Sequence, residues 1–235
     1  MMYRTSITRL HETRALRAAL ATLAGTLFLS VTLVACGNPD TGPVETEERQ
    51  VGAFQSIELR GAAEMTVQVG AAHSLKVTAS SRTRAAFTAE VQGDKLILET
   101  HNRFFEPQLG KAVVLVTLPQ LHSLIVSGAG DVKVTNVASD TLNLALNGAA
   151  NVEADGKAGN LVVSMNGAGN MDLSRLEAGS AIVAVNGAGS MDVNATGSLN
   201  ATVNGVGSIN YYGKPAQVTT AVNGVGSISP HTQDH

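Results

Sequence analysis

A tetrapeptide of the form Asn-Gly-Ala-Gly recurs through the second half of the chain and constrains its fold more than any other feature. Six copies begin at residues 127, 147, 166, 186, 204 and 223, so successive copies lie 20, 19, 20, 18 and 19 residues apart. A weaker copy, Arg-Gly-Ala-Ala, begins at Arg60. Such regular spacing indicates that each repeat is one structural unit that packs against its neighbours.

The residues around each copy alternate between apolar and polar. Leu144 and Leu146 precede the second copy, and Val152 and Glu153 follow it. A period of two predicts half-buried β-strands, in which Leu146 and Val152 point inward and Glu153 points outward. No stretch from residue 54 onward shows a convincing helical period, so the sequence predicts an all-β domain.

Two all-β architectures compete. Asn-Gly between alternating strands is a strong hairpin signal, which allows an antiparallel meander or barrel. The near-constant repeat length and the faithful repetition of side chains favour a parallel β-solenoid, in which like residues stack on like. Because crossovers between parallel strands are right-handed, the prediction is a right-handed parallel β-helix over residues 53–235, with coils of 18–20 residues.

The length of the domain gives an expected number of coils. The 182 residues from Phe54 to the end would form roughly nine to ten coils. Residues 54–126 lack the glycine motif and are expected to form the less regular first coils and an end cap, since terminal repeats are atypical. Residues 101–111 are predicted to be an inserted loop.

The glycines of the motif are expected at the corners of the coils. A corner between two flat strands has no interior volume for a side chain, and glycine also accepts a positive φ angle. The expected corner glycines are Gly128, Gly130, Gly148, Gly167, Gly169, Gly187, Gly189, Gly205, Gly207, Gly224 and Gly226.

Residues 1–35 have the anatomy of a lipoprotein signal peptide. A segment with four arginines precedes an apolar run that ends in Leu-Val-Ala-Cys at Cys36, which resembles a bacterial lipobox. Cys36 is the expected lipidation site, because its thiol would carry the acyl chains that anchor a soluble domain. By resemblance to enterobacterial lipoprotein sorting, Gly37 after it favours the outer membrane. A transmembrane helix is the alternative. Residues 36–52 hold two prolines and an acidic cluster, and they are predicted to be a flexible tether.

Composition disfavours several classes of function. The net charge is −3, and the part after residue 35 carries −6, which argues against nucleic-acid binding. Aromatic residues make up only 3%, with no tryptophan, which argues against stacking platforms. The single cysteine excludes an intrachain disulfide and a cysteine metal cluster. No phosphate-binding loop, dinucleotide fingerprint or catalytic triad order is present, so no catalytic residue, metal or cofactor is expected.

The motifs at both ends of the domain resemble the head GIN domain family, described as heads of autotransporter adhesins. The resemblance begins with the strand motif at Phe54, continues through the Gly-Ala-Gly and Gly-Val-Gly coils, and ends at Tyr212 and Gly224. It covers residues 50–235, with asparagine where serine often precedes the glycines. It implies a right-handed β-helix on an exported or lipid-anchored bacterial protein, and it brings no catalytic residues.

Three outward rows are the candidate binding residues. The first is the asparagine ladder Asn147, Asn166, Asn186, Asn204 and Asn223. The second is Asp131, Asn151, Asn170, Ser190, Ser208 and Ser227, and the third is the acidic row Glu153, Asp172 and Asp192. The rows either satisfy one another as solvated ladders or form a polar groove for glycan hydroxyls. Stacked carboxylates repel unless they are screened or a cation such as calcium bridges them.

The sequence therefore predicts a lipid-anchored β-solenoid of the cell envelope with a non-catalytic role in binding, adhesion or structure. Its expected partners are the membrane, through the lipid on Cys36, and a cell-surface glycan or protein. A periplasmic accessory protein in envelope stress or signalling is the alternative from another class. A polysaccharide-active enzyme is less favoured, because such enzymes build clefts from long loops and the loops here are tight.

Overall fold

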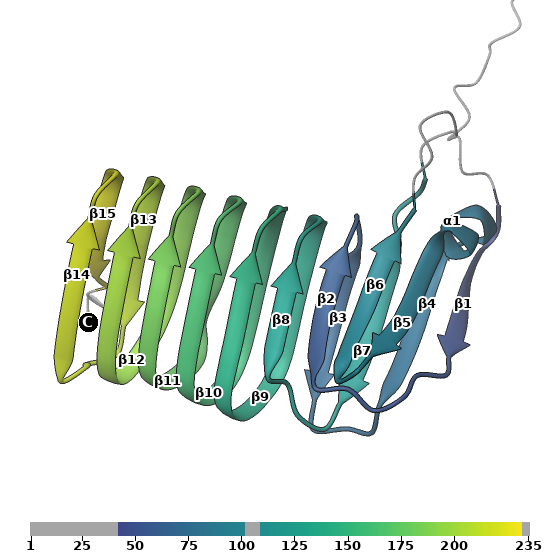
Figure 1. Cartoon of the computed structure of the whole chain (residues 1–235), viewed down its shortest axis with the longest axis horizontal. Helices are drawn as coiled ribbons and strands as arrows, with labels where there is room; N and C mark the ends of the chain where they lie inside the picture. The colour runs from purple at the N-terminus through teal and green to yellow at the C-terminus, as the bar shows by residue number, and fades with distance from the viewer. Residues whose placement is uncertain (1–41, 102–108, 232–235) are drawn as a thin grey trace, which may run out of the picture. The chain divides into compact units, whose positions relative to one another are not determined.

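The computed structural model describes residues 42–101 and 109–231, which form a parallel β-solenoid (Figure 1). Four long strands each bend through most of one coil: β9 (Ala129–Leu146), β10 (Ala149–Met165), β11 (Ala168–Val185) and β12 (Ala188–Val203). They pair in parallel with like residues in register, so that Met171 lies between Val152 and Met191. In Figure 1 the chain runs up the front strands, passes over the top and runs down behind them, while it advances toward the C-terminal end. This sense of winding is right-handed.

Each coil contributes to two facing sheets. We call sheet A the one that contains the residues before each motif asparagine, and sheet B the one that contains the residues after each glycine motif. Sheet A is completed by β14 (Gln217–Val222), β8 (Ser123–Val126), β2 (Ser56–Arg60) and β6 (Lys95–Thr100). Sheet B is completed by β15 (Val225–Pro230), β13 (Val206–Tyr212), β3 (Glu64–Val69) and β7 (Val113–Leu118).

The space between the sheets is filled by the inward residues of the alternating pattern. In sheet A, Leu142, Leu161, Ala181 and Leu199 stack in register, and each is at most 2% exposed. Full burial of an aliphatic side chain stabilises a fold by about 1.5–3 kcal/mol. The stacked rows therefore provide a core that continues from coil to coil.

The first coils do not follow one another in sequence order. The coil made of β2 and β3 pairs on one side with β8 and β9, and on the other side with β6 and β7. The chain thus leaves the solenoid after β3 and adds the β6–β7 coil outside it before β8 resumes the stack. The weak motif copy at Arg60 occupies the corner next to Gly128, where a Cβ on Gly128 would overlap the carbonyl oxygen of Gly61.

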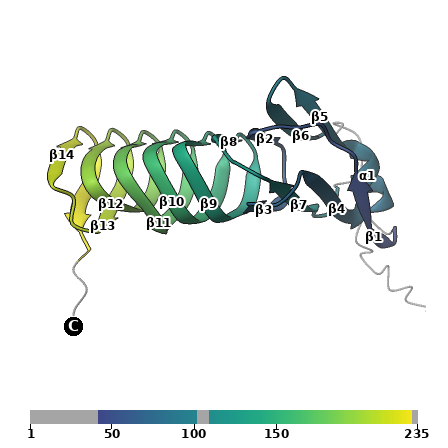
Figure 2. The same ribbon diagram turned by 90° about the horizontal axis from the view of Figure 1, so that it is seen from below.

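Antiparallel strands and a short helix close the N-terminal end of the solenoid (Figure 2). β4 (Ser74–Ser80) pairs antiparallel with β7, and β5 (Phe87–Gln92) pairs antiparallel with β6. Between them lies α1 (Ser81–Ala86), capped by Ser80, whose hydroxyl accepts the backbone N–H of Thr83. The sequence shows no helical period here because six residues make fewer than two helical turns.

The segment predicted to be a flexible tether contains a further strand. β1 (Val44–Arg49) pairs antiparallel with β4, and the Arg49 guanidinium donates to the backbone carbonyls of Phe87 and Arg84 at 2.6 and 2.9 Å. The prediction of a tether over residues 36–52 is therefore wrong within this strand. All its side chains except Arg49 are exposed, so no apolar pattern could reveal it in the sequence.

The predicted all-β, right-handed parallel β-helix is confirmed, although the number of coils is not. The regular repeats form about five turns, fewer than the expected nine to ten, because residues 54–126 form the separate coils β2–β3 and β6–β7 and the cap elements β4, α1 and β5. Most of the expected inserted loop, the signal peptide and Cys36 lie outside the described residues. In the part that the structure describes, no helix combines the length and the apolar character that crossing a membrane requires.

Candidate functional site

The asparagine ladder runs along the edge at which the strands of sheet A end. All five members are exposed, and from Asn166 onward each amide Nδ2 donates to the Oδ1 of its neighbour in the preceding coil over 2.7–3.0 Å. An interior amide such as Asn186 uses one N–H and one carbonyl lone pair in the ladder, which leaves one of each for solvent or a ligand. The ladder also has a direction. Its N–H donors point toward the N-terminal end of the solenoid, and the Oδ1 of Asn223 is the free acceptor at its C-terminal end.

The second predicted row also forms a ladder, at the start of sheet B. Its six members, Asp131, Asn151, Asn170, Ser190, Ser208 and Ser227, are in register. Hydrogen bonds of 2.9, 3.3 and 2.7 Å join the first four in succession. A shallow depression lined by Asp131, Ala149, Asn151 and Ala168 lies beside the start of this row.

The carboxylates of the acidic row already have partners within the protein. Glu153 lies 3.7 Å from the Lys133 ammonium and 3.4 Å from the Arg175 guanidinium. Asp172 accepts a hydrogen bond of 2.6 Å from the Ser174 hydroxyl, and this bond holds the pKa of Asp172 below its ordinary value.

The third carboxylate of this row, that of Asp192, accepts from the Asn210 amide at 2.9 Å. Glu153 thus has two cationic partners, whereas the hydrogen bonds to Asp172 and Asp192 come from neutral donors. Within the described ranges, no group of three or more His, Cys, Asp or Glu residues could hold a metal ion.

The corner glycines meet the preceding coil rather than an empty interior. A Cβ placed on any of the eleven predicted glycines would lie closer than 3.0 Å to a backbone carbonyl oxygen of the previous coil. Gly130, Gly169 and Gly189 also have φ angles of 134°, 143° and 151°. Glycine is required at these corners because successive backbones approach along the solenoid axis, and only in part because the interior is narrow.

Sequence reasoning missed a larger surface, the outward face of sheet A in its last five strands. We call it the uncharged face. Its residues form four rows of five: Thr141, Asn160, Ser180, Ser198 and Gln217; Asn143, Val162, Ile182, Asn200 and Thr219; Ala145, Ser164, Ala184, Thr202 and Ala221; and the asparagine ladder. None of the twenty is charged. The absence of charge could have been found in the sequence by inspecting the outward positions of the predicted strands.

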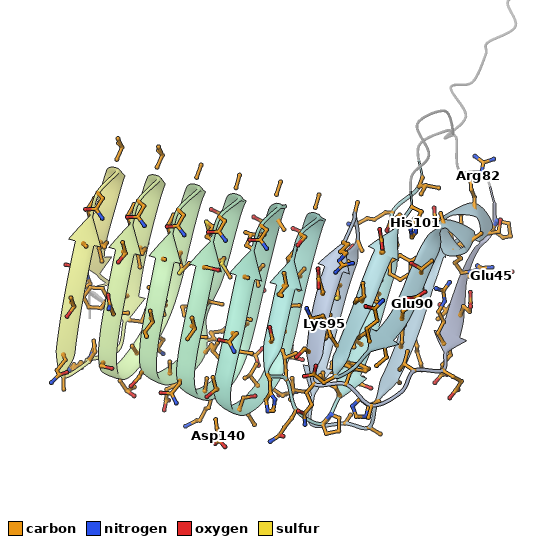
Figure 3. The ribbon with its side chains drawn as sticks, viewed as in Figure 1. Glu45, Arg82, Glu90, Lys95, His101 and Asp140 are labelled. Carbon is orange, nitrogen blue, oxygen red and sulfur yellow. The ribbon has the colours of Figure 1, made fainter. Side chains whose placement is uncertain are left out.

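The charged residues lie elsewhere on the described surface. In Figure 3, Glu45, Glu90 and Lys95 lie toward the N-terminal end, and Asp140 lies at the corner where the strands of sheet A begin. Short polar and apolar side chains cover the strands of sheet A between that corner and the asparagine ladder. At the centre of the face, Val162 and Ile182 are adjacent and are 39% and 56% exposed.

These features define a class of protein: a right-handed parallel β-solenoid whose coils carry hydrogen-bonded ladders and one uncharged sheet face. The chain belongs to the family described as "putative auto-transporter adhesin, head GIN domain", whose model matches residues 53–215. The resemblance seen in the sequence is thereby confirmed. The family name describes an adhesin rather than an enzyme.

The chain is similar to several solved structures at low sequence identity, and the first of them shows the same fold. A putative adhesin from Bacteroides fragilis is 23% identical, with a TM-score of 0.66 over 82% of this chain and 99% of that one. A putative lipid binding protein from Parabacteroides distasonis is 20% identical, with a TM-score of 0.48 over 82% and 98%. A putative adhesin from Parabacteroides merdae is 18% identical, with a TM-score of 0.48 over the same shares. No curated protein matches the chain.

Proposed function

We propose that this chain is a lipid-anchored adhesin of the cell envelope, and that its uncharged face binds a neutral glycan without altering it chemically. The observation that carries the proposal is this face, twenty outward positions over five strands without one charge. The description of the family as adhesins supports a binding role. Lipid anchoring rests on the lipobox at Cys36.

Charge selects the class of ligand. An anionic polymer would be recognised by Lys or Arg and a cationic one by Asp or Glu, and the face offers neither. Its exposed groups are amides, hydroxyls and, at the centre, the aliphatic side chains of Val162 and Ile182. A neutral sugar matches this combination, because it presents hydroxyl groups around its edge and C–H groups on its ring faces.

The repeat of the solenoid suits a polymer better than a single sugar. Successive coils place the same row at intervals of about 4.8 Å, so a chain laid along the axis meets similar groups at every coil. Each contact is weak on its own, because an exposed hydrogen bond has a net value of only about 0.5–1.5 kcal/mol. Several contacts in series raise the apparent affinity through effective concentration.

The test is a binding assay of the purified chain on insoluble neutral polysaccharides (cellulose, chitin and mannan), with the acidic polymer alginate for comparison. Ile182→Glu places a charge at the centre of the uncharged face and should weaken binding at least about tenfold. Arg175→Gln lowers the net charge by the same amount on an exposed residue outside this face, and it should leave binding unchanged. Equal binding by both variants, or preference for alginate, would contradict the assignment of the face.

A further inference from the structure

Among the described residues, the solenoid ends in an open last coil. β14 and β15 form the last coil, and no strand or helix of the described residues stacks beyond them (Figures 1 and 2). Val218 and Val222 occupy inward positions and are 43% and 45% exposed, whereas Leu199 and Val203 at the same positions one coil earlier are at most 2% exposed. The last layer of the core thus faces outward along the axis.

The outer backbone edge of this last coil also has no paired strand among the described residues. The N–H of Asn223 donates to the carbonyl of Val203 in the preceding coil. Successive residues of a strand direct their N–H and C=O groups to opposite sides. Val218, Thr220 and Val222 therefore direct theirs toward the open end, as alternate residues of β15 do on the other sheet. Such an edge is a template for pairing with another chain.

The open end lacks the features that commonly prevent edge pairing. β14 and β15 contain no charged residue, and the one proline, Pro230, is the last residue of β15. The opposite end differs, because antiparallel strands close it and charged pairs such as Arg84 with Glu45, at 3.0 Å, lie on it. Head-to-tail stacking of copies is therefore blocked, whereas the C-terminal end can pair with the C-terminal end of a second copy.

We propose that two copies of this chain dimerise through their open C-terminal ends, about a two-fold axis perpendicular to the solenoid axis. Such an axis sets the edge strands of one copy antiparallel to those of the other, so both sheets continue across the interface. A second copy offers two edges at the same separation, about 10 Å. A single extended strand from another protein would cover only one of them.

The C-terminal end is chemically compatible with the same end of a second copy. Because β14 and β15 carry no charge, no like charges meet where these edge strands pair, and Val218 and Val222 become covered by the second copy. The interface is isologous, and the closed N-terminal ends stop the assembly at two copies. This inference does not depend on the proposed glycan ligand.

The size of the end sets the expected affinity. Strands of six residues span about 20 Å, and two sheets about 10 Å apart with their side chains cover a similar width. The two copies would then bury roughly 800 Å² in total, below the usual range for specific interfaces. We expect a reversible dimer with a dissociation constant in the micromolar range.

Sedimentation equilibrium of the full chain in density-matched non-ionic detergent measures the dimer directly. The wild-type mass should rise from one to two copies with concentration. Thr220→Lys and Thr220→Glu each place a charge on the open end, and each alone should stay monomeric, whereas an equimolar mixture should dimerise. Thr219→Lys is the matched control, because Thr219 is also exposed but points outward from sheet A, and it should dimerise like the wild type.

Several outcomes would overturn the proposal. These are a wild type that stays monomeric throughout, a Thr220→Lys variant that dimerises as the wild type does, and species larger than two copies. If the mixture of the two charged variants also stays monomeric, the substitutions have disturbed the last coil rather than the interface, and the proposal fails as well.

Discussion

Gly169 lies so close to Ala150 of the preceding coil that a Cβ on Gly169 would overlap the carbonyl oxygen of Ala150. The same relationship recurs at each motif corner, where a glycine lies against the carbonyl of the residue at the same position one coil earlier. It explains why the motif repeats with such fidelity: the corner is the place where adjacent backbones have no room for side chains between them.

Gly169→Val should therefore destabilise the domain strongly. The substitution adds the overlap with the Ala150 carbonyl and a side chain at a φ angle of 143°, which together should cost at least about 2 kcal/mol. Ala168→Ser, at the exposed position between the two glycines, should stay within about 0.5 kcal/mol of the wild type. Thermal melts of both variants give the answer, and equal losses would show that the corner is wrongly placed.

The asparagine ladder should lose more stability from its middle than from its end. Asn186→Ala removes two hydrogen bonds, to Asn166 and from Asn204, whereas Asn223→Ala removes only its bond to Asn204. At about 0.5 kcal/mol for each exposed bond, we expect losses of about 1 and about 0.5 kcal/mol by denaturant titration. Losses of equal size at both positions would mean that the ladder does not act as a chain of hydrogen bonds.

The bond between Ser174 and Asp172 should make stability depend on pH. Because this bond lowers the pKa of Asp172 from its ordinary 3.8, its contribution is fully present above that value and is lost as pH falls through the lower pKa of the folded state. Ser174→Ala should thus lower the melting temperature at pH 6 and have less effect near about pH 2. Ser208→Ala, at a serine of the second row, is the control whose effect should not vary with pH.

Arg49 should be a stabilising residue rather than part of a loose linker. Its guanidinium binds the carbonyls of Phe87 and Arg84 and lies 5.7 Å from the centre of the Phe87 ring. Arg49→Ala should cost about 1–3 kcal/mol in a chemical denaturation experiment, because both bonds carry a charged donor. Glu48→Ala, on the exposed neighbouring residue, should be neutral. A neutral Arg49→Ala would restore the tether interpretation for this segment.

Cys36→Ala tests the anchor. If Cys36 carries the lipid, the variant should leave the membrane fraction, since no acyl chain would hold the domain at the bilayer. Cell fractionation followed by immunoblotting measures the distribution. A variant that remains bound and uncleaved would show instead that the leader is a membrane-spanning helix.

The sequence by itself determined the repeated part of the molecule. Contacts in a solenoid join residues one coil apart, such as Met171 with Met191, so they leave a period that can be read directly. The period predicts parallel pairing, the register of the asparagine ladder and the corner positions of the glycines. The period also identifies the outward positions of the strands, and these positions show that one face carries no charged residue.

Only the tertiary structure decided the closed N-terminal end and the environment of the site. Pairs such as Val44 with Ser80 join residues that share no repeat, and the exposed side chains of β1 carry no apolar pattern. The placement of the β6–β7 coil outside the β2–β3 coil depends on which free edge a strand reaches, and this is a long-range choice. Likewise, the ion pairs of Glu153 with Lys133 and Arg175 depend on side chains that neighbouring coils bring together only after folding.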